Sequence, residues 1–287
     1  MMNQKDDAKR SGEANLLTLA PGVALELVRV PAGEFVMGSN SLRDLEAYDN
    51  ETPQHRLYLP DYWMGKYPVR VAQFAAFVKA TGYQTTAEKD KSAYAYTGSE
   101  WKDIKGADWQ HPSGPQSDVQ HAERANHPVT LVSWDDAVAF CQWASQITGR
   151  TVRLPNEAEW EKAARGTDGR LWPWGNEPPD GQRCNFNMNV KDTTPVGHYS
   201  PRGDSPYGCA DMAGNVWEWT GNLWKAYPYN ANDGRQDQNS REARVLRGGS
   251  LYNTRRDARC AFRSLGDGPF LRLNNSGFRV CVHPLSP

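Results

Sequence analysis

Apolar positions near the start of the chain alternate with polar ones in short runs. The run Val23–Val30 alternates up to Pro31, and Glu34–Gly38 resumes the pattern after a turn. Alternation with a period of two is typical of a strand with one buried face, so we predict a hairpin from these two runs. The short apolar runs at 57–59 and 62–64 predict one further strand.

Helical spacing replaces this alternation in three places. Apolar residues recur on one stripe over 71–82, which predicts an amphipathic helix. The capping box Ser133–Asp136 opens a second predicted helix, which we expect to end at Gly149. A second capping box, Asn156–Glu159, predicts a short helix that ends at Gly166.

The rest of the chain shows no helical period. Residues 84–126 are polar and aperiodic, which predicts a long surface excursion. After Gly166, short aromatic segments alternate with turn residues, as in a loop-rich region with a small antiparallel sheet. We therefore predict one α+β domain over 22–287, with about four short helices, after a mobile N-terminal tail at 1–21.

Composition indicates a soluble globular protein. The 287 residues are 38% hydrophobic, with 33 basic and 34 acidic side chains. A mean hydropathy of −0.76 and the lack of a long apolar run argue against a spanning helix. The near-zero net charge argues against nucleic acid or a membrane surface as partner. No apolar signal core is visible near the N-terminus, so we expect a cytoplasmic location.

The cysteines and histidines do not suggest a metal cage. The five cysteines are odd in number and lack CxxC spacing, so buried free thiols are expected at Cys141, Cys184, Cys209, Cys260 and Cys281. The six histidines are scattered along the chain, and each is interpreted as a structural residue.

A series of motifs follows the chain in order. They include His127–Trp134, Arg153–Glu161, Asp211–Trp219, Leu246–Ser250 and Gly277–Arg279. Together they resemble the formylglycine-generating enzyme family, or sulfatase-modifying-factor domain, over about residues 22–284. The resemblance implies a C-type-lectin-like fold, loop-rich with short antiparallel strands and few helices. The family contains oxidases, iron-dependent sulfoxide synthases and non-catalytic binding proteins, so the fold alone leaves the activity open.

The copper site of the formylglycine-forming oxidases has no counterpart here. Those enzymes resemble this chain up to Ser250 and then carry two cysteines whose thiolates bind copper(I). In 251–263 the only thiol is Cys260, which aligns with a cysteine outside that pair. No copper is therefore expected, and the sulfoxide synthases' helical bundle with its iron-binding histidines is also missing from the sequence.

The resemblance further implies structural calcium, an ion that takes oxygen ligands. The implied ligands at one site are the side chains of Asp211 and Glu218 with the carbonyls of Gly214 and Val216. A second site would use Asn185 and the Phe186 carbonyl, with Asp192 as a weaker candidate. The alternative is that Asp211 and Glu218 only cap backbone amides.

The resemblance also aligns Cys141 with a cysteine that can bridge to the residue after Gly-Phe-Arg. Here that residue is Val280, and the thiol comes one position later, at Cys281. A shift of one residue along a strand turns the side chain to the opposite face, so free thiols are favoured and pairing stays open.

Residues 251–276 resemble the variable region of diversity-generating retroelement proteins. In such regions mutagenesis of adenines in Asn codons cannot yield Trp, Gln, Lys, Glu or Met, and all five types are absent after Ser250. The expected ligand-binding residues are Tyr252, Asn253, Thr254, Asp257, Phe262, Ser264, Leu265, Asp267, Phe270, Leu271, Leu273, Asn274 and Asn275. The alternative is an ordinary C-terminal loop that is small and polar.

These observations favour a non-catalytic binding protein with a diversified C-terminal surface for an unknown protein or small-molecule ligand. One alternative is an oxidoreductase of the same family that lacks the copper-binding cysteines and acts on an unknown substrate, and another is a structural or regulatory subunit. A binding face would leave the variable side chains of the segment mostly exposed in one patch. Arg255, Arg259 and Arg263 would then pair with acids or carbonyls of the scaffold.

Overall fold

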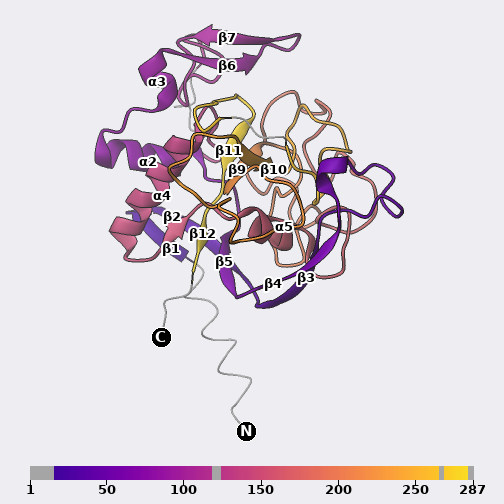
Figure 1. Cartoon of the computed structure of the whole chain (residues 1–287). Helices are drawn as coiled ribbons and strands as arrows, with labels where there is room; N and C mark the ends of the chain where they lie inside the picture. The colour runs from indigo at the N-terminus through magenta and orange to yellow at the C-terminus, as the bar shows by residue number, and fades with distance from the viewer. Residues whose placement is uncertain (1–15, 118–123, 265–267, 284–287) are drawn as a thin grey trace.

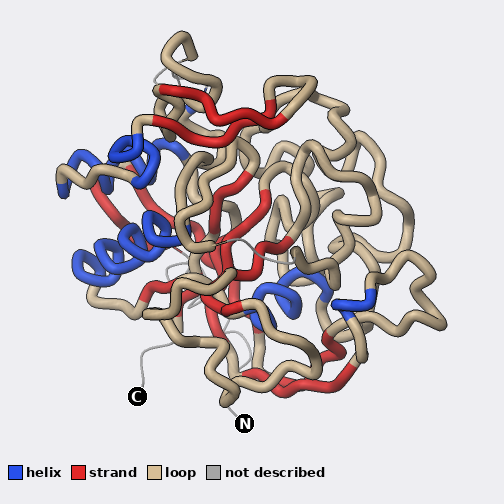
Figure 2. The backbone as a smooth tube through the Cα atoms, turned by 45° about the horizontal axis from the view of Figure 1, so that its top comes forward, coloured by secondary structure: helices blue, strands red, loops and turns tan. Residues whose placement is uncertain are grey.

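The computed structural model describes residues 16–117, 124–264 and 268–283. Short helices and small sheets are joined by long loops (Figures 1 and 2). The helices are α2 (Val71–Thr81), α3 (Thr86–Asp90), α4 (Trp134–Thr148) and α5 (Glu157–Arg165), with one 3-10 turn, η1, at Asp49–Glu51. This is the loop-rich α+β architecture that the sequence predicted.

The three predicted helices are confirmed, and their ends follow the predicted signals. The side chains of Ser133 and Asn156 each accept a hydrogen bond from the backbone N–H three residues further on. Such caps satisfy amide groups that have no partner inside the helix. Helices α2 and α4 end at Gly82 and Gly149, whose φ angles of +66° and +65° favour glycine.

The main sheet has five strands in the order β1-β2-β5-β12-β8, paired antiparallel throughout. The strands are β1 (Leu16–Ala20), β2 (Val23–Val30), β5 (Tyr62–Gly65), β8 (Val152–Arg153) and β12 (Cys281–Val282). Helices α2 and α4 pack on β1 and β2. The core between them is aromatic, since the Phe74 ring lies 5.4 Å from Phe77 and 6.4 Å from Phe278.

A second sheet carries the C-terminal segment. Its order is β10-β9-β11, with β9 at Trp217–Leu223, β10 at Arg244–Arg247 and β11 at Ser276–Phe278. Strand β10 runs antiparallel to β9, whereas β11 runs parallel to it. The chain therefore leaves one side of β9 after Arg247 and returns on the other side at Ser276, with the segment 248–275 between.

The predicted hairpin of the first two runs is wrong. Strand β2 pairs with β1 and β5, while β3 (Gly33–Met37) pairs with β4 (His55–Leu59) in a separate two-stranded sheet. The single strand predicted across 57–64 is likewise two strands, β4 and β5, in different sheets. Alternation identifies which face of a strand is buried, but it does not identify the strand's partner.

The N-terminal boundary also differs from the prediction. Residues 16–20 were expected in the tail, but they form β1, in which Leu17 and Leu19 are buried. Residues 1–15 of the predicted tail lie outside the described part. In the described part no helix is long and apolar enough to cross a membrane.

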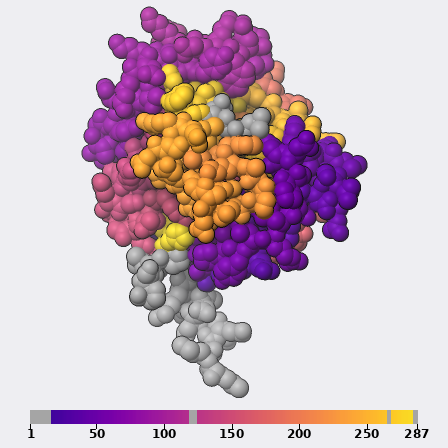
Figure 3. Space-filling view, in the orientation of Figure 1, coloured from indigo at the N-terminus to yellow at the C-terminus, as the bar shows by residue number. Residues whose placement is uncertain are grey.

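The predicted excursion at 84–126 contains secondary structure. It holds α3 and a hairpin of β6 (Ser92–Tyr96) with β7 (Trp101–Lys105). The hairpin projects at the top of Figure 1, and in Figure 3 the yellow C-terminal residues lie directly beneath this purple region. A backbone bridge between Tyr94 and Leu273 joins the two segments, so the hairpin lies against the predicted variable segment.

Candidate functional site

Buried arginine–carboxylate pairs hold the C-terminal segment to the scaffold. Arg259 donates to Asp44 Oδ2 at 2.6 Å and to both carboxylate oxygens of Glu51 at 2.6 and 2.7 Å. Both Arg259 and Glu51 are fully buried. Bidentate pairs of this kind fix position as well as charge. Arg255 forms a pair with Glu46 nearer the surface.

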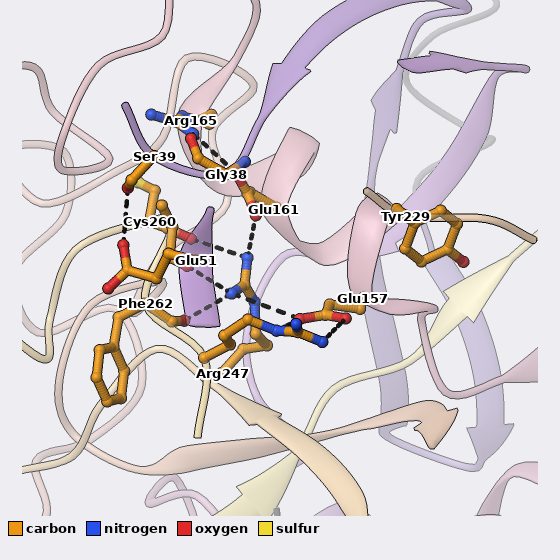
Figure 4. A network of polar contacts seen from close by, with 12 residues as sticks. Gly38, Ser39, Glu51, Glu157, Glu161, Arg165, Tyr229, Arg247, Cys260 and Phe262 are labelled. Carbon is orange, nitrogen blue, oxygen red and sulfur yellow. Dashed lines mark hydrogen bonds and ion pairs between the residues drawn. The ribbon is translucent and has the colours of Figure 1, made fainter. Parts of the chain in front are cut away.

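A second group of pairs lies beside α5 (Figure 4). Arg263 donates to both oxygens of Glu157 at 2.6 and 2.8 Å. Arg247 pairs with Glu161 and also donates to the carbonyls of residues 260–262. Arg165 donates to Glu161 at 2.7 Å. Burial alone would raise the pKa of Glu161, but the two arginines hold it below its ordinary value.

These contacts confirm that Arg255, Arg259 and Arg263 pair with acids of the scaffold. Each partner lies far away in the sequence, at Glu46, Glu51 or Glu157. The three arginines, which are not among the predicted variable positions, therefore anchor the backbone of 255–263 to distant parts of the chain.

A cavity of about 560 Å³ opens beside the segment. Its wall includes Tyr252 and Asn274 from the predicted ligand-binding residues, with Leu251 next to them. The other walls come from the hairpin and the loops that follow it, at residues 95–98, 104, 109, 112–113, 124, 127–128, 130, 188 and 191–193, together with Val71 of α2. The cavity thus lies between the predicted variable segment and the excursion.

Aromatic rings gather where the hairpin meets the segment. The Tyr252 ring lies 4.8 Å from Tyr96 and 5.7 Å from Trp101, and Tyr94 stacks on Trp101 at 6.0 Å. Asn274 fixes this contact, because its Oδ1 accepts the Tyr96 N–H at 3.1 Å and its Nδ2 donates to the Tyr252 hydroxyl at 3.3 Å.

Charged and polar groups line another wall of the cavity. Arg124 forms a bidentate pair with Asp192, and His127 Nδ1 lies 2.8 Å from Thr193 Oγ1. Burial and the neighbouring Arg124 lower the pKa of His127, so its ring is neutral at pH 7. Lys191 is exposed and forms no ion pair with any described residue.

The predicted ligand-binding residues do not form a single exposed patch. Of those described, only Thr254 and Phe270 are exposed, Asn275 is buried and the others are half-buried, namely Tyr252, Asn253, Asp257, Phe262, Ser264, Leu271, Leu273 and Asn274. The expectation of mostly exposed side chains is therefore wrong. The arginine pairs explain this, since they hold the segment against the body. Leu265 and Asp267 lie outside the described residues.

Several of these residues support the segment instead of lining the cavity. Asn253 Oδ1 accepts from the backbone and hydroxyl of Ser250 at 3.0 and 2.7 Å. The Phe262 ring packs 5.1 Å from Tyr48 and 5.6 Å from Trp217. Asp257 accepts the Tyr48 hydroxyl at 3.2 Å. Their side chains hold the loop in shape.

Sequence reasoning missed most of the other cavity walls. Tyr96, Arg124, His127 and Lys191 lie in segments that showed no helical period, and none was proposed as a ligand-binding residue. One signal was available, because Ser92–Tyr96 alternates polar or aromatic residues with alanine. Short alanine-containing strands of this kind are weak signals, since alanine is depleted in strands.

Comparison with known proteins identifies the scaffold. Residues 18–284 match the family model of the sulfatase-modifying factor enzyme 1-like domain. The chain belongs to this family. It is 37% identical to the mouse formylglycine-generating enzyme over 96% of this chain and 81% of that protein. It is also 32% identical to the bovine inactive C-alpha-formylglycine-generating enzyme 2, over 92% of this chain and 90% of that protein.

Solved structures share the fold of this chain. PvdO from Pseudomonas aeruginosa superposes with a TM-score of 0.75 at 23% identity, over 94% of this chain and 98% of that one. Variable protein 1 of Treponema denticola gives a TM-score of 0.69 at 21% identity, over 94% and 98%. The predicted C-type-lectin-like fold of the sulfatase-modifying factor family is confirmed.

The calcium that the family resemblance implies fits one of the two predicted positions. Asn185 is buried, its Nδ2 donates to the Asp192 carbonyl at 2.7 Å, and its Oδ1 has no partner among the described residues. The buried Thr194 Oγ1 also has none there, and Asn215 bonds to both residues. Partnerless buried oxygens are what a hard cation would take. The Phe186 carbonyl accepts from Asn189, and the Asp192 carboxylate is held by Arg124.

The other predicted position fits less well. Both Glu218 oxygens are held by Arg279 at 2.5 and 2.6 Å, and one also accepts from Trp160 Nε1 at 2.7 Å. Asp211 Oδ2 accepts the Gly197 N–H at 2.7 Å. The side chains implied as ligands alongside the Gly214 and Val216 carbonyls are thus already bonded to protein groups. Asp211 caps a backbone amide, as in the alternative, whereas Glu218 is held by side chains. In the described part no three His, Cys, Asp or Glu residues gather as a metal-binding group.

The thiols are free and buried, as predicted, including Cys141 and Cys281. Burial raises the pKa of the Cys260 thiol to about 12. A thiol rather than a thiolate is therefore present at neutral pH, and only the thiolate reacts as a nucleophile or binds a soft metal.

Proposed function

We propose that this protein is a non-catalytic ligand-binding member of the family, and that its ligand occupies the cavity beside Tyr252. The observation that carries this proposal is that Tyr252 and Asn274, two predicted variable positions, meet the hairpin β6–β7 at the cavity wall. A volume of about 560 Å³ is in the range of small-molecule sites.

The arginine pairs support this function because the arginines that anchor the segment do not line the cavity. Arg259 and Arg263 anchor the backbone to Glu51 and Glu157. Side chains at the cavity can then differ between variants of the protein while the backbone keeps its position. Little loop ordering would accompany binding, and that lowers the entropic cost of association.

The competing proposal is an oxidoreductase acting on an unknown substrate, and the 37% identity to the mouse formylglycine-generating enzyme favours it. The chemistry at the corresponding segment favours binding instead. Its single thiol, Cys260, is fully buried and its pKa is raised. We therefore expect that copper-loaded protein leaves a sulfatase-type cysteine peptide unchanged. Conversion above the background of a heat-denatured sample, measured by mass spectrometry, would establish the oxidase.

The binding proposal is tested by a screen of small aromatic molecules, read by saturation-transfer NMR. Binders of the native protein should lose signal with Tyr252→Ala and keep it with Phe270→Ser. Phe270 belongs to the same segment but is 59% exposed and does not line the cavity. Equal binding by the two variants would show that the cavity is not the site.

A further inference from the structure

The charge of the cavity wall points to the chemistry of the ligand. We propose that the cavity binds a small aromatic carboxylate, with the carboxylate near Lys191 and the flat ring against Tyr96 and Tyr252. This inference rests on the proposed function and specifies the class of ligand.

Among the described residues, the charged groups of the wall leave one positive charge uncompensated. They are Arg124, Lys191 and Asp192. Both terminal nitrogens of Arg124 donate to the Asp192 carboxylate. His127 adds no charge, since burial and Arg124 keep its ring neutral. Lys191 has no partner among the described residues. An anion at this wall would gain a charge-assisted hydrogen bond without displacing an existing pair.

The aromatic part of the cavity lining suits a planar apolar body. Tyr96 and Tyr252 meet at 4.8 Å with their ring planes tilted by 56°. Asn274 holds both residues, through the backbone of Tyr96 and the hydroxyl of Tyr252. Ile104 and Pro112 extend the apolar surface. Rings fixed in this way offer an edge or a face to a third ring at little conformational cost.

The preference is measured with N-acetylphenylalanine and its amide, two probes of the same shape in which an uncharged carboxamide replaces the carboxylate. Isothermal titration of the native protein at low salt should show the acid binding about tenfold more tightly, the effect of one charge-assisted contact. In Lys191→Gln the acid should bind no more than about threefold more tightly than the amide. Lys79→Gln, an equivalent change on the exposed end of α2 outside the cavity, should leave the ratio unchanged.

The results separate this inference from the proposed function. Equal affinity for acid and amide, both lost with Tyr252→Ala, would overturn the carboxylate preference and leave the cavity as the binding site. No heat from either probe at millimolar concentration would overturn both. A short alanine peptide that ends in phenylalanine supplies the same carboxylate on a longer chain. Binding equal to that of the acid would support a peptide C-terminus as the source, whereas its loss would support a free small molecule.

Discussion

Individual charged residues contribute very differently to this molecule, depending on how deeply they are buried. Arg263 and Glu157 are both fully enclosed, whereas the Arg255 side chain is 57% exposed beside Glu46. Removing one partner of a buried pair leaves an uncompensated charge in a poorly solvated place. The same removal at the surface leaves a charge that water solvates.

We therefore expect Arg263→Met to lower the free energy of unfolding by about 3–5 kcal/mol. Arg255→Met is the matched control and should cost less than about 1 kcal/mol. Urea unfolding followed by tryptophan fluorescence measures both. Similar losses in the two variants would mean that burial of the pair has no bearing on how the segment is held.

The buried carboxyl group of Asp211 should make the free energy of unfolding depend on pH. Burial raises its pKa to about 6, above the value of about 3.9 expected in the unfolded chain. The folded protein therefore binds the proton more tightly than the unfolded chain does. As pH rises from about 4 to 6, this carboxyl group increasingly lowers the free energy of unfolding.

Asp211→Asn should consequently stabilise the metal-free protein at pH 7, by a gain on the order of 3 kcal/mol. The gain should vanish below about pH 4, where both side chains are neutral. Unfolding in chelator at several pH values provides the measurement. If the difference in free energy of unfolding between the native protein and Asp211→Asn were the same at every pH, titration of Asp211 would not be its cause.

At the scale of elements, local signals predicted the helices well and the pairing of strands poorly. Capping boxes and glycine ends depend on nearby residues, so α4 and α5 could be read directly from the sequence. Strand β2 pairs with β1, which directly precedes it but was assigned to the tail, and with β5, which lies in a distant segment of the chain. The walls of the cavity share this limitation, because Tyr96 and Tyr252 meet only through tertiary contacts.

Asn274 is one of the attachments of the hairpin β6–β7, beside the Tyr94–Leu273 bridge and the bonds from Arg272 to the Ser92 carbonyl. The Asn274 side chain makes two hydrogen bonds to the backbone of Tyr96. Each is worth about 1 kcal/mol, so Asn274→Ala should increase hydrogen exchange of residues 92–105 by about tenfold or more. Asn230→Ala, in an exposed loop remote from the hairpin, should leave that exchange unchanged. Unaltered protection after Asn274→Ala would show that the hairpin is held by its other contacts, namely the rings and the hydrogen bonds to Arg272.

At the scale of the whole molecule, the loop 185–194 and the loop that carries Asn215 meet through the buried amides of Asn185 and Asn215. We propose that calcium binds at Asn185, where a buried oxygen has no protein partner in the described part. An ion that binds only the folded state stabilises it by about 2.7 kcal/mol at a hundredfold excess over its dissociation constant.

Calcium should therefore raise the melting temperature after chelator treatment, and Asn185→Leu should respond less than the native protein does. Magnesium serves as a control, because it prefers fewer ligands in a stricter octahedral geometry. Differential scanning fluorimetry measures the shift. A native protein whose melting temperature is the same with chelator and with excess calcium would contradict the proposal.

The pairing of β10 and β11 on opposite sides of β9 has a consequence for protein engineering. The two ends of 248–275 are clamped by one central strand, so grafting a segment of another length would not move its points of attachment. Closing a flexible loop of twice the length costs only about 0.6 kcal/mol more. A library that keeps Arg255, Arg259 and Arg263 but changes both the length and the sequence between them and β11 would turn the domain into a display scaffold for new recognition loops.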